Sequence, residues 1–204
     1  MTSRTAEPLL AADQEMYEVR WHGRGGQGAV TSAKILADAG FRSGFAGVTS
    51  APTFGAERRG APITASTRLA VHPIRVLSQV NTPDVVVVLD ESLIDVAGVA
   101  TGLRPHGVVI VNSAASPNEL AKRLGALPSG ARVVAADVTG AATAAELMVA
   151  GVPMVNTAML GAIAAATGLI SMEALRAAIE RVFAARPAAK NYAAATIAAG
   201  CVQV

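Results

Sequence analysis

Shortages of several residue types narrow the functions open to this chain. Its 204 residues include one cysteine, Cys201, so it can form no internal disulfide and cannot supply the four cysteine ligands of an iron–sulfur cluster. The three histidines, His22, His72 and His106, fall in separate segments without the spacing of metal ligands. We therefore expect no metal site here, and any redox cluster must belong to another chain.

Charge and aromatic residues are also scarce. Charged residues make up 16% of the chain, aromatic residues 3%, and the formal net charge is +2. Without lysine or arginine tracts or interleaved aromatics, we expect no binding to nucleic acid. The apolar step at residues 9–12 is too short for a signal-peptide core or a membrane span. We expect a cytoplasmic protein without membrane contact.

Hydrophobic residues, many of them alanine, make up 52% of the sequence, which indicates well-packed helices and large buried or interface faces. Strands are predicted at residues 17–21 and 63–70, the second with one wetter face, and buried strands at residues 84–90, 107–112 and 131–138. Helices are predicted at residues 30–39, 92–101, 139–150, 156–168, 171–185 and 190–200, with another opened by Ser116 and Pro117.

Alternation of strands and helices is typical of parallel βαβ units. We predict an α/β fold, a three-layer α/β/α single domain with a mainly parallel sheet and a helical C-terminal third. Residues 1–16 are expected to form a flexible tail, and residues 17–204 the domain.

A glycine-rich segment between the first strand and the first helix is the strongest local signal. It comprises Gly23, Arg24, Gly25, Gly26, Gln27 and Gly28. Glycines permit a tight turn, and backbone N–H groups at the start of a helix favour anions, phosphate above all. The alternative is a tight turn that only packs the helix on the strand or on a partner subunit.

The spacing of Gly23, Gly25 and Gly28 also fits the fingerprint of dinucleotide-binding folds, but neither that motif nor the Walker loop is complete. No acidic residue stands about 20 residues further on to hold a ribose. No Gly-Lys-Ser/Thr follows, so the segment is no Walker loop.

A second candidate is the loop at residues 51–62, where two prolines and two glycines interrupt regular structure. Arg58 and Arg59 could bind a phosphate or carboxylate, with Glu57 orienting one of them. The alternative is a surface salt-bridge cluster or a subunit contact.

Polar residues also begin two predicted helices. Asn156 is a candidate site residue, although a role as helix N-cap is favoured. Asp90 and Glu91 end a buried strand, and capping of the next helix is favoured for them as well. Gly161 lies on a thin helix face that would permit close approach of another backbone.

Six ordered blocks of sequence resemble a known family. They are residues 22–28 (His-Gly-Arg-Gly-Gly-Gln-Gly), 54–62 (Phe-Gly-Ala-Glu-Arg-Arg-Gly-Ala-Pro), 83–84 with 88–90, 111–113, 137–139, and 156–157 with 159–162. Together they are similar to the gamma subunit, or equivalent domain, of 2-oxoacid:ferredoxin oxidoreductases, over residues 18–183. The block at residues 54–62 looks most like the pyruvate enzyme.

The resemblance implies a reaction carried by an assembly. Such enzymes decarboxylate a 2-oxoacid on thiamine diphosphate, pass two electrons through [4Fe-4S] clusters to ferredoxin, and release the acyl group to coenzyme A. In the family, thiamine diphosphate, Mg²⁺ and the clusters lie on other subunits (alpha, beta, delta or fused equivalents). This chain would bind no cofactor alone, contribute no catalytic residue, and assist assembly as a structural, ligand-adjacent subunit. Contact of its glycine segment and of Arg58 and Arg59 with coenzyme A phosphates is a hypothesis that rests on anion binding at helix starts and on the two adjacent arginines.

Two other functions remain open. One is a stand-alone Rossmann-like domain that binds a nucleotide or coenzyme A. The other is a purely scaffolding subunit whose loops contact only protein.

Overall fold

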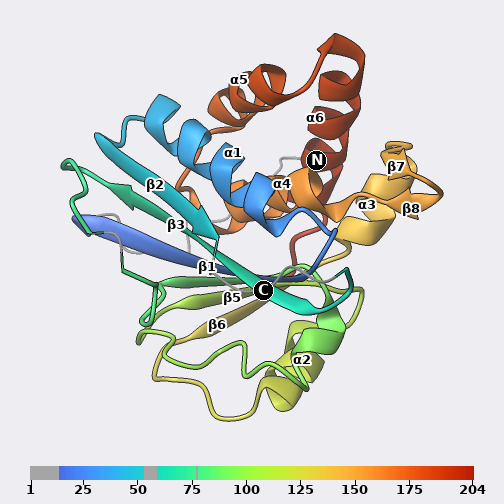
Figure 1. Ribbon diagram of the computed structural model, residues 1–204. Coiled ribbons are helices and arrows are strands. Elements are labelled where there is room, and N and C mark those ends of the chain that lie inside the picture. Colours follow the sequence, from blue (N-terminus) through green and yellow to red (C-terminus); the bar gives the residue numbers. More distant parts are fainter. Residues whose placement is uncertain (1–13, 53–58, 77) are drawn as a thin grey trace, which may run out of the picture.

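The structure is a computed structural model and describes residues 14–52, 59–76 and 78–204 (Figure 1). Six strands form the main sheet in the order β2-β3-β1-β4-β5-β6. In chain order they are β1 (Met16–Arg24), β2 (Gly47–Pro52), β3 (Pro62–Ala70), β4 (Val85–Val88), β5 (Val108–Asn112) and β6 (Arg132–Ala136).

Strand direction divides the sheet into two parts. β1, β4, β5 and β6 run parallel to one another. β3 is antiparallel to both of its neighbours, β1 and β2. β3 therefore separates β2 from β1, and that placement was not predicted from the sequence.

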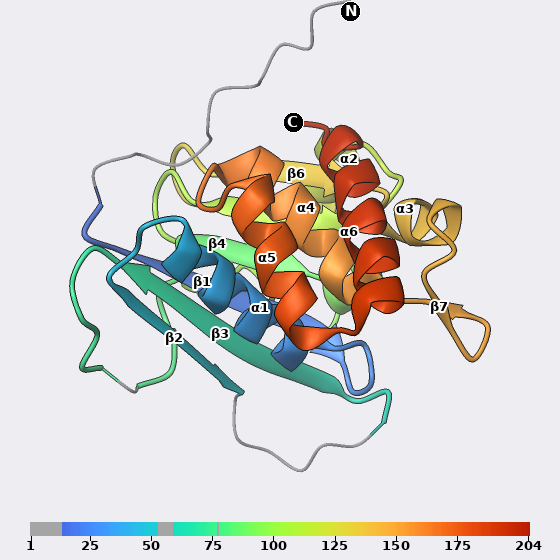
Figure 2. The same ribbon diagram turned by 90° about the horizontal axis from the view of Figure 1, so that it is seen from above.

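Helices cover the two faces of the sheet unequally, as Figures 1 and 2 show. One face carries α1 (Ala29–Arg42), α3 (Val138–Ala144), α4 (Val155–Thr167), α5 (Met172–Val182) and α6 (Ala185–Gly200). The other face carries α2 (Pro117–Leu124), which Ser116 and Glu119 begin with a capping box. The predicted fold class, with three layers, a mainly parallel sheet and a helical C-terminal third, is confirmed.

Two hydrophobic clusters follow from side-chain alternation along the strands. Val85 and Val87 face the five-helix layer with Trp21, whereas Val86 and Val88 face α2. All four valines of β4 are fully buried, as expected of a strand covered on both faces.

The predicted thin face on α4 is confirmed. A Cβ built on Gly161 would lie 1.8 Å from the backbone oxygen of Ala195 in α6. Glycine at this position therefore lets the two helix backbones approach more closely than any side chain would allow.

The helix predicted at residues 92–101 is wrong. Only a short 3₁₀ turn, Glu91–Leu93, forms there, followed by further turns. Gly98 adopts a φ of 52° and Gly102 a φ of 74°. These left-handed conformations interrupt a right-handed helix.

The helix predicted at residues 139–150 is also wrong in its length. α3 ends at Ala144, and Glu146 takes a left-handed φ of 52°. A hairpin follows, made of β7 (Met148–Val149) and β8 (Val152–Pro153), with Ala150 and Gly151 at its turn. Positive φ values at both turn residues are the conformation of a type I′ hairpin turn.

The last two helices are divided differently from the prediction. α5 ends at Val182, and α6 begins at Ala185 rather than at Lys190. Pro187 lies in the first turn of α6, where its missing N–H removes no helical hydrogen bond.

Past α6 the chain returns to the sheet. Gln203 and Ala135 exchange two backbone hydrogen bonds, at 2.8 and 3.0 Å, along the outer side of β6. Among the described residues, no helix is both long and apolar enough to cross a lipid bilayer.

Candidate functional site

The candidate site lies where the chain connections diverge at the sheet. α1, which follows β1, packs on one face, whereas the turns after β4 and the helix after β5 cover the opposite face. In open α/β sheets, such a switch point opens a crevice at the carboxyl ends of the strands, and ligands bind there.

A cavity of about 350 Å³ occupies this position. Its lining comes from the ends of four parallel strands and from the segment that leads into α4. The lining residues are Gly26, Gln27, Leu89, Asp90, Glu91, Asn112, Thr139, Val152, Pro153, Met154 and Val155. This volume is at the lower end of the range for small-molecule sites.

The glycine segment forms the predicted turn from strand to helix. Gly26 has a φ of 96° and Gly28 a φ of 81°, and Gly28 is the N-cap of α1. No side chain caps this helix. Among the described residues, its first N–H groups therefore keep hydrogen-bonding capacity for an anion.

Asp90 organises the polar side of the cavity. Its carboxylate accepts hydrogen bonds from Arg24 Nε and Gln27 Nε2, both at 3.0 Å, and from the backbone and hydroxyl of Ser92. Burial opposes ionisation of Asp90, but the hydrogen bonds from Ser92 and Gln27 and the charge of Arg24 lower its pKa overall. The expected capping role of Asp90 is confirmed for the 3₁₀ turn.

The same carboxylate fixes the glycine segment. Gln27 Oε1 accepts from the Arg24 N–H at 2.7 Å, while Arg24 also donates to the Gly60 carbonyl at 3.1 Å. Asp90 therefore ties β4 to the loop after β1, and its own negative charge is compensated by Arg24.

Two further polar groups line the cavity. Asn112 donates to the Leu89 carbonyl and to the Thr139 hydroxyl, each at 3.0 Å. The Glu91 carboxylate is paired with Arg123. Asn112 was absent from the predicted site residues, although it is the first polar residue after a buried apolar strand and so carried a signal.

Asn156 lies beside the glycine segment but is not a helix N-cap, so the predicted capping role is wrong. The N-cap of α4 is Met154, and no side chain caps that helix. Asn156 is buried, and its Oδ1 accepts from the N–H of Thr157 at 2.8 Å. Its amide packs against Gly28, as judged from a Cβ built there.

The second predicted loop is described in part. Glu57 and Arg58 lie outside the described residues. Arg59 is exposed, and its backbone forms a bridge with Gly25 in which the Gly60 N–H donates to the Gly25 carbonyl at 3.1 Å. The two loops singled out in the sequence are thus neighbours.

His22, which adjoins the glycine segment in sequence, faces a different cavity. It is 5% exposed, and its Nε2 accepts from Arg20 Nε at 3.1 Å. Burial and then the charge of Arg20 lower its pKa to about 4. Both side chains line a separate cavity of about 380 Å³, of which the glycine segment is not part.

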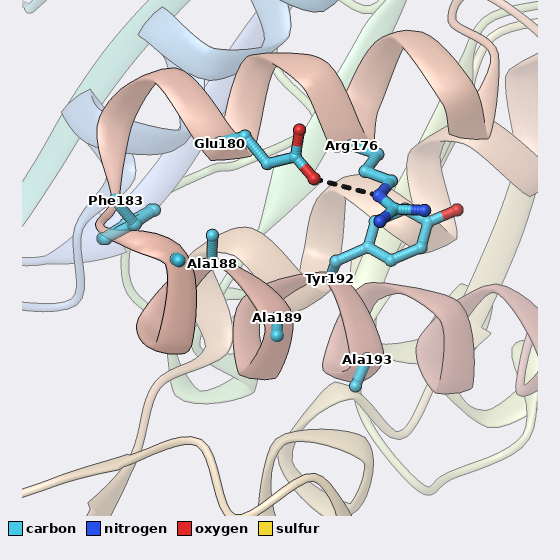
Figure 3. A pocket seen from close by; sticks show the side chains of 8 residues that line it. Arg176, Glu180, Phe183, Ala188, Ala189, Tyr192 and Ala193 are labelled. Atoms are coloured by element: carbon cyan, nitrogen blue, oxygen red, sulfur yellow. Dashed lines mark hydrogen bonds and ion pairs between the residues drawn. The ribbon is translucent and has the colours of Figure 1, made fainter.

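A third cavity, of about 620 Å³, lies between α5 and α6 (Figure 3). Arg176 crosses it, paired with Glu180 at 2.9 Å and stacked 5.6 Å from the centre of the Tyr192 ring. Arg176 and Glu180 therefore satisfy each other, and alanines provide most of the remaining lining. This cavity therefore offers a ligand fewer polar groups than the crevice at the switch point does.

The strand order weighs against the dinucleotide alternative. In that fold, the strand bearing the ribose-binding acid lies next to the strand before the glycine loop. Here β3 lies between β1 and β2. Within the described ranges, no group of three or more His, Cys, Asp or Glu side chains is placed to hold a metal ion.

Comparisons with known proteins agree with this geometry. Residues 18–201 match the model of the family described as pyruvate ferredoxin/flavodoxin oxidoreductase. The common subunit gamma of the pyruvate/ketoisovalerate oxidoreductases of Thermococcus kodakarensis is 49% identical over 180 residues, which are 88% of this chain and 94% of that protein.

Solved structures share the fold. Pyruvate oxidoreductase subunit PORC of Thermotoga maritima is 32% identical with a TM-score of 0.78, covering 93% of this chain and 98% of its own. The 2-oxoglutarate:ferredoxin oxidoreductase of Magnetococcus marinus, solved with 2-oxoglutarate, coenzyme A and succinyl-CoA bound, is 20% identical with a TM-score of 0.67. That match covers 92% of this chain and 32% of that one, and at this identity it carries the fold alone.

Proposed function

The chain belongs to the pyruvate ferredoxin/flavodoxin oxidoreductase family, as a gamma subunit, and on this basis we propose that its crevice binds a phosphate-bearing part of coenzyme A. The oxidoreductase acts on pyruvate or a related 2-oxoacid, and this chain is one of its subunits. Coenzyme A would accept the acyl group, while the chemistry proceeds on other subunits.

One observation carries the proposal: two helices without side-chain caps begin at the same cavity. Gln27 lies just before α1 and Val155 begins α4, and both residues line the 350 Å³ space. The positive ends of two helix dipoles suit a phosphate group. No side chain caps the first N–H groups of α1, whereas in α4 the Thr157 N–H is already bonded to Asn156 Oδ1. The cavity has room for part of coenzyme A, so the remainder would extend past its opening.

The carboxylates at the cavity do not oppose an anion strongly. The charge of Asp90 is compensated by Arg24, with a further hydrogen bond from the neutral Gln27 amide, and the charge of Glu91 is compensated by Arg123. Arg59, close to Gly25, adds a cation that can reach a second phosphate group.

Thiamine diphosphate, Mg²⁺ and [4Fe-4S] clusters are assigned to the other subunits in this proposal. The single cysteine of the chain agrees with that division. The glycine segment, residues 23–28, and the loop with Glu57, Arg58 and Arg59 would face those subunits, and ferredoxin would be reduced through the complex. We infer a cytoplasmic location for the assembly.

The test uses the complete oxidoreductase purified with an Arg58→Ala/Arg59→Ala double variant of this chain. Loss of one charge-assisted contact to phosphate weakens binding by about tenfold or more. We expect the Michaelis constant for coenzyme A to rise by that factor while the constant for the 2-oxoacid stays unchanged. Arg176→Ala, on exposed α5 and paired with Glu180, is the matched control.

Hydrogen exchange separates ligand binding from a scaffolding role. Coenzyme A added to the assembled wild-type enzyme should slow exchange at the start of α1 and α4. Unchanged exchange together with an unchanged Michaelis constant in the double variant would refute the proposal and favour a purely scaffolding subunit.

A further inference from the structure

The hairpin made of β7 and β8 is an unusual surface feature. It projects from the body of the molecule beside α3 (Figures 1 and 2). Three of its apolar side chains are exposed: Met148 by 42%, Val149 by 58% and Val152 by 62%. The sequence from Leu147 to Met172 contains no charged residue, so no charged side chain of this segment shields the surface.

The base of the hairpin is firmly attached. Leu147 is buried, its N–H donates to the Ala142 carbonyl at 2.8 Å, and its own carbonyl accepts from the Met154 N–H at 2.9 Å. Lys190 of α6 holds the Glu146 carboxylate at 3.1 Å. These contacts fix the orientation of the hairpin relative to the rest of the domain.

Its turn carries backbone strain. Ala150 adopts a φ of 49°, a left-handed conformation that disfavours side chains, and Glu146 at the base does the same. Such a residue costs about 1–2 kcal/mol. Strained positions cluster at functional sites, where the conformation itself serves a purpose.

The hairpin is also continuous with the candidate site. Val152 and Pro153 of β8 line the 350 Å³ cavity together with Met154 and Val155. A chain that covered this cavity would therefore lie beside the hairpin.

We propose that this hairpin is a docking element for another subunit of the same oxidoreductase, and that its three exposed apolar side chains enter an uncharged groove of that subunit. The proposal rests on the gamma-subunit assignment but not on coenzyme A binding. Stable interfaces bury on the order of 1,200–2,000 Å² in total. Three side chains fall far short of that area, so they would anchor a wider contact that includes the cavity rim.

Two other occupants fit less well. A second copy of the chain joined through the hairpins alone would bury too little surface for a stable dimer. An anionic membrane surface would be met by basic residues beside the apolar tip, but the neighbouring Lys190 is already paired with Glu146.

The test compares assembly of tagged chains co-produced with the other oxidoreductase subunits. In the Val149→Asp/Val152→Asp variant, we expect at least a tenfold loss of those subunits after affinity purification and gel filtration. Val96→Asp is the matched control, because Val96 is 68% exposed and lies in the turns after β4. It should retain full assembly.

A milder variant guards against misfolding. Val149→Thr/Val152→Thr keeps the side-chain shape and strand preference but adds hydroxyls. It should unfold at the wild-type temperature and still lose subunits severalfold. Full assembly of both hairpin variants would overturn the proposal, as would a loss confined to self-association or to vesicle binding.

The outcome is independent of the coenzyme A proposal. Subunit recovery is scored without coenzyme A, whereas the arginine variants are scored on its Michaelis constant. Normal assembly with a raised constant would refute only the docking role.

Discussion

Asn156, in the first turn of α4, packs against Gly28, the N-cap of α1, so closely that a Cβ at position 28 would lie 2.6 Å from the Asn156 amide nitrogen. The contact holds together the two helix starts that border the candidate cavity. The contact is one of two reasons why position 28 carries no side chain. The other is its φ of 81°, which disfavours a side chain by itself.

Gly28→Ala should therefore destabilise the protein more than Gly26→Ala. Both residues have positive φ, so both substitutions carry a backbone penalty of about 1–2 kcal/mol. At Gly26 nothing lies within 4 Å of the added Cβ, whereas Gly28 adds the overlap with Asn156, about 1 kcal/mol more. Urea unfolding of the two variants measures the difference.

A double-mutant cycle isolates this contact. Asn156→Ala should relieve part of the additional penalty of Gly28→Ala, because it removes the amide that lies 2.6 Å away but keeps the Cβ that lies 3.0 Å away. The two substitutions together should therefore be less harmful than their sum. Strict additivity would show that the contact does not limit position 28.

Gly161→Ala should disrupt the packing of α4 on α6. Its Cβ would lie 1.8 Å from a backbone oxygen, which cannot move aside as a flexible side chain can. We expect a loss of about 3 kcal/mol or more in unfolding free energy. Gly200→Ala, at the end of α6 with nothing within 4 Å, is the control and should be neutral or slightly stabilising.

His22 makes the folded protein sensitive to mild acid. The pKa of its imidazole is lowered to about 4 in the folded state, from an ordinary value of 6.5. The contribution of neutral His22 to the free energy of unfolding is therefore fully present above pH 6.5. It declines by about 3 kcal/mol as the pH falls to 4, because the imidazole takes up its proton at higher pH in the unfolded state than in the folded state. Unfolding measured across this range should show the decline.

His22→Gln provides the comparison for that experiment. The glutamine cannot titrate, so the variant should be less stable at neutral pH but should lose less stability between pH 6.5 and 4. A parallel decline in both proteins would assign the acid sensitivity to other groups.

Asp90→Asn should weaken the connection between β4 and the glycine segment. The carboxylate accepts from Arg24 and Gln27, so we expect a loss of about 1–2 kcal/mol at neutral pH. Because the folded pKa is depressed below its ordinary value of 3.8, the contribution is present above pH 3.8 and is lost as the pH falls through the folded value.

The matched substitution for Asp90→Asn is Asp95→Asn. Asp95 is 57% exposed on its side chain and pairs with Arg123, a surface ion pair that contributes about 0–1 kcal/mol. If Asp95→Asn proved as harmful as Asp90→Asn, the special role of Asp90 would be refuted.

Much of the fold was accessible from the sequence because its strongest patterns are local. The valine run of β4 predicted a doubly covered strand, and Ser116 with Glu119 predicted the start of α2. The direction of β3 was not accessible, because alternation along a strand does not say which neighbour it joins or which way it runs.

The errors also have physical causes. Residues 139–150 contain good helix formers, but Glu146 and Ala150 adopt left-handed conformations, the first beside its ion pair with Lys190 of α6 and the second at the turn of the β7–β8 hairpin. Propensity is a weak predictor where such contacts decide. Within the helix expected after β4, Gly98 adopts a left-handed conformation that a right-handed helix cannot include.

The candidate site was predicted in part. The glycine segment and Arg59 lie together as neighbours, whereas Asn112 joins the cavity through the ends of parallel strands far apart in the sequence. That convergence depends on strand order, which motifs do not encode. Whether these residues bind a ligand stays a prediction.

The pairing of Gln203 with Ala135 has a consequence for behaviour at high concentration. An outermost strand exposes unpaired backbone groups that can recruit another chain into a shared sheet. By pairing with the N–H and the carbonyl of Ala135 in β6, the segment after α6 blocks part of this edge and so opposes edge-to-edge aggregation. Fusions or truncations near position 203 would remove this pairing and favour precipitation.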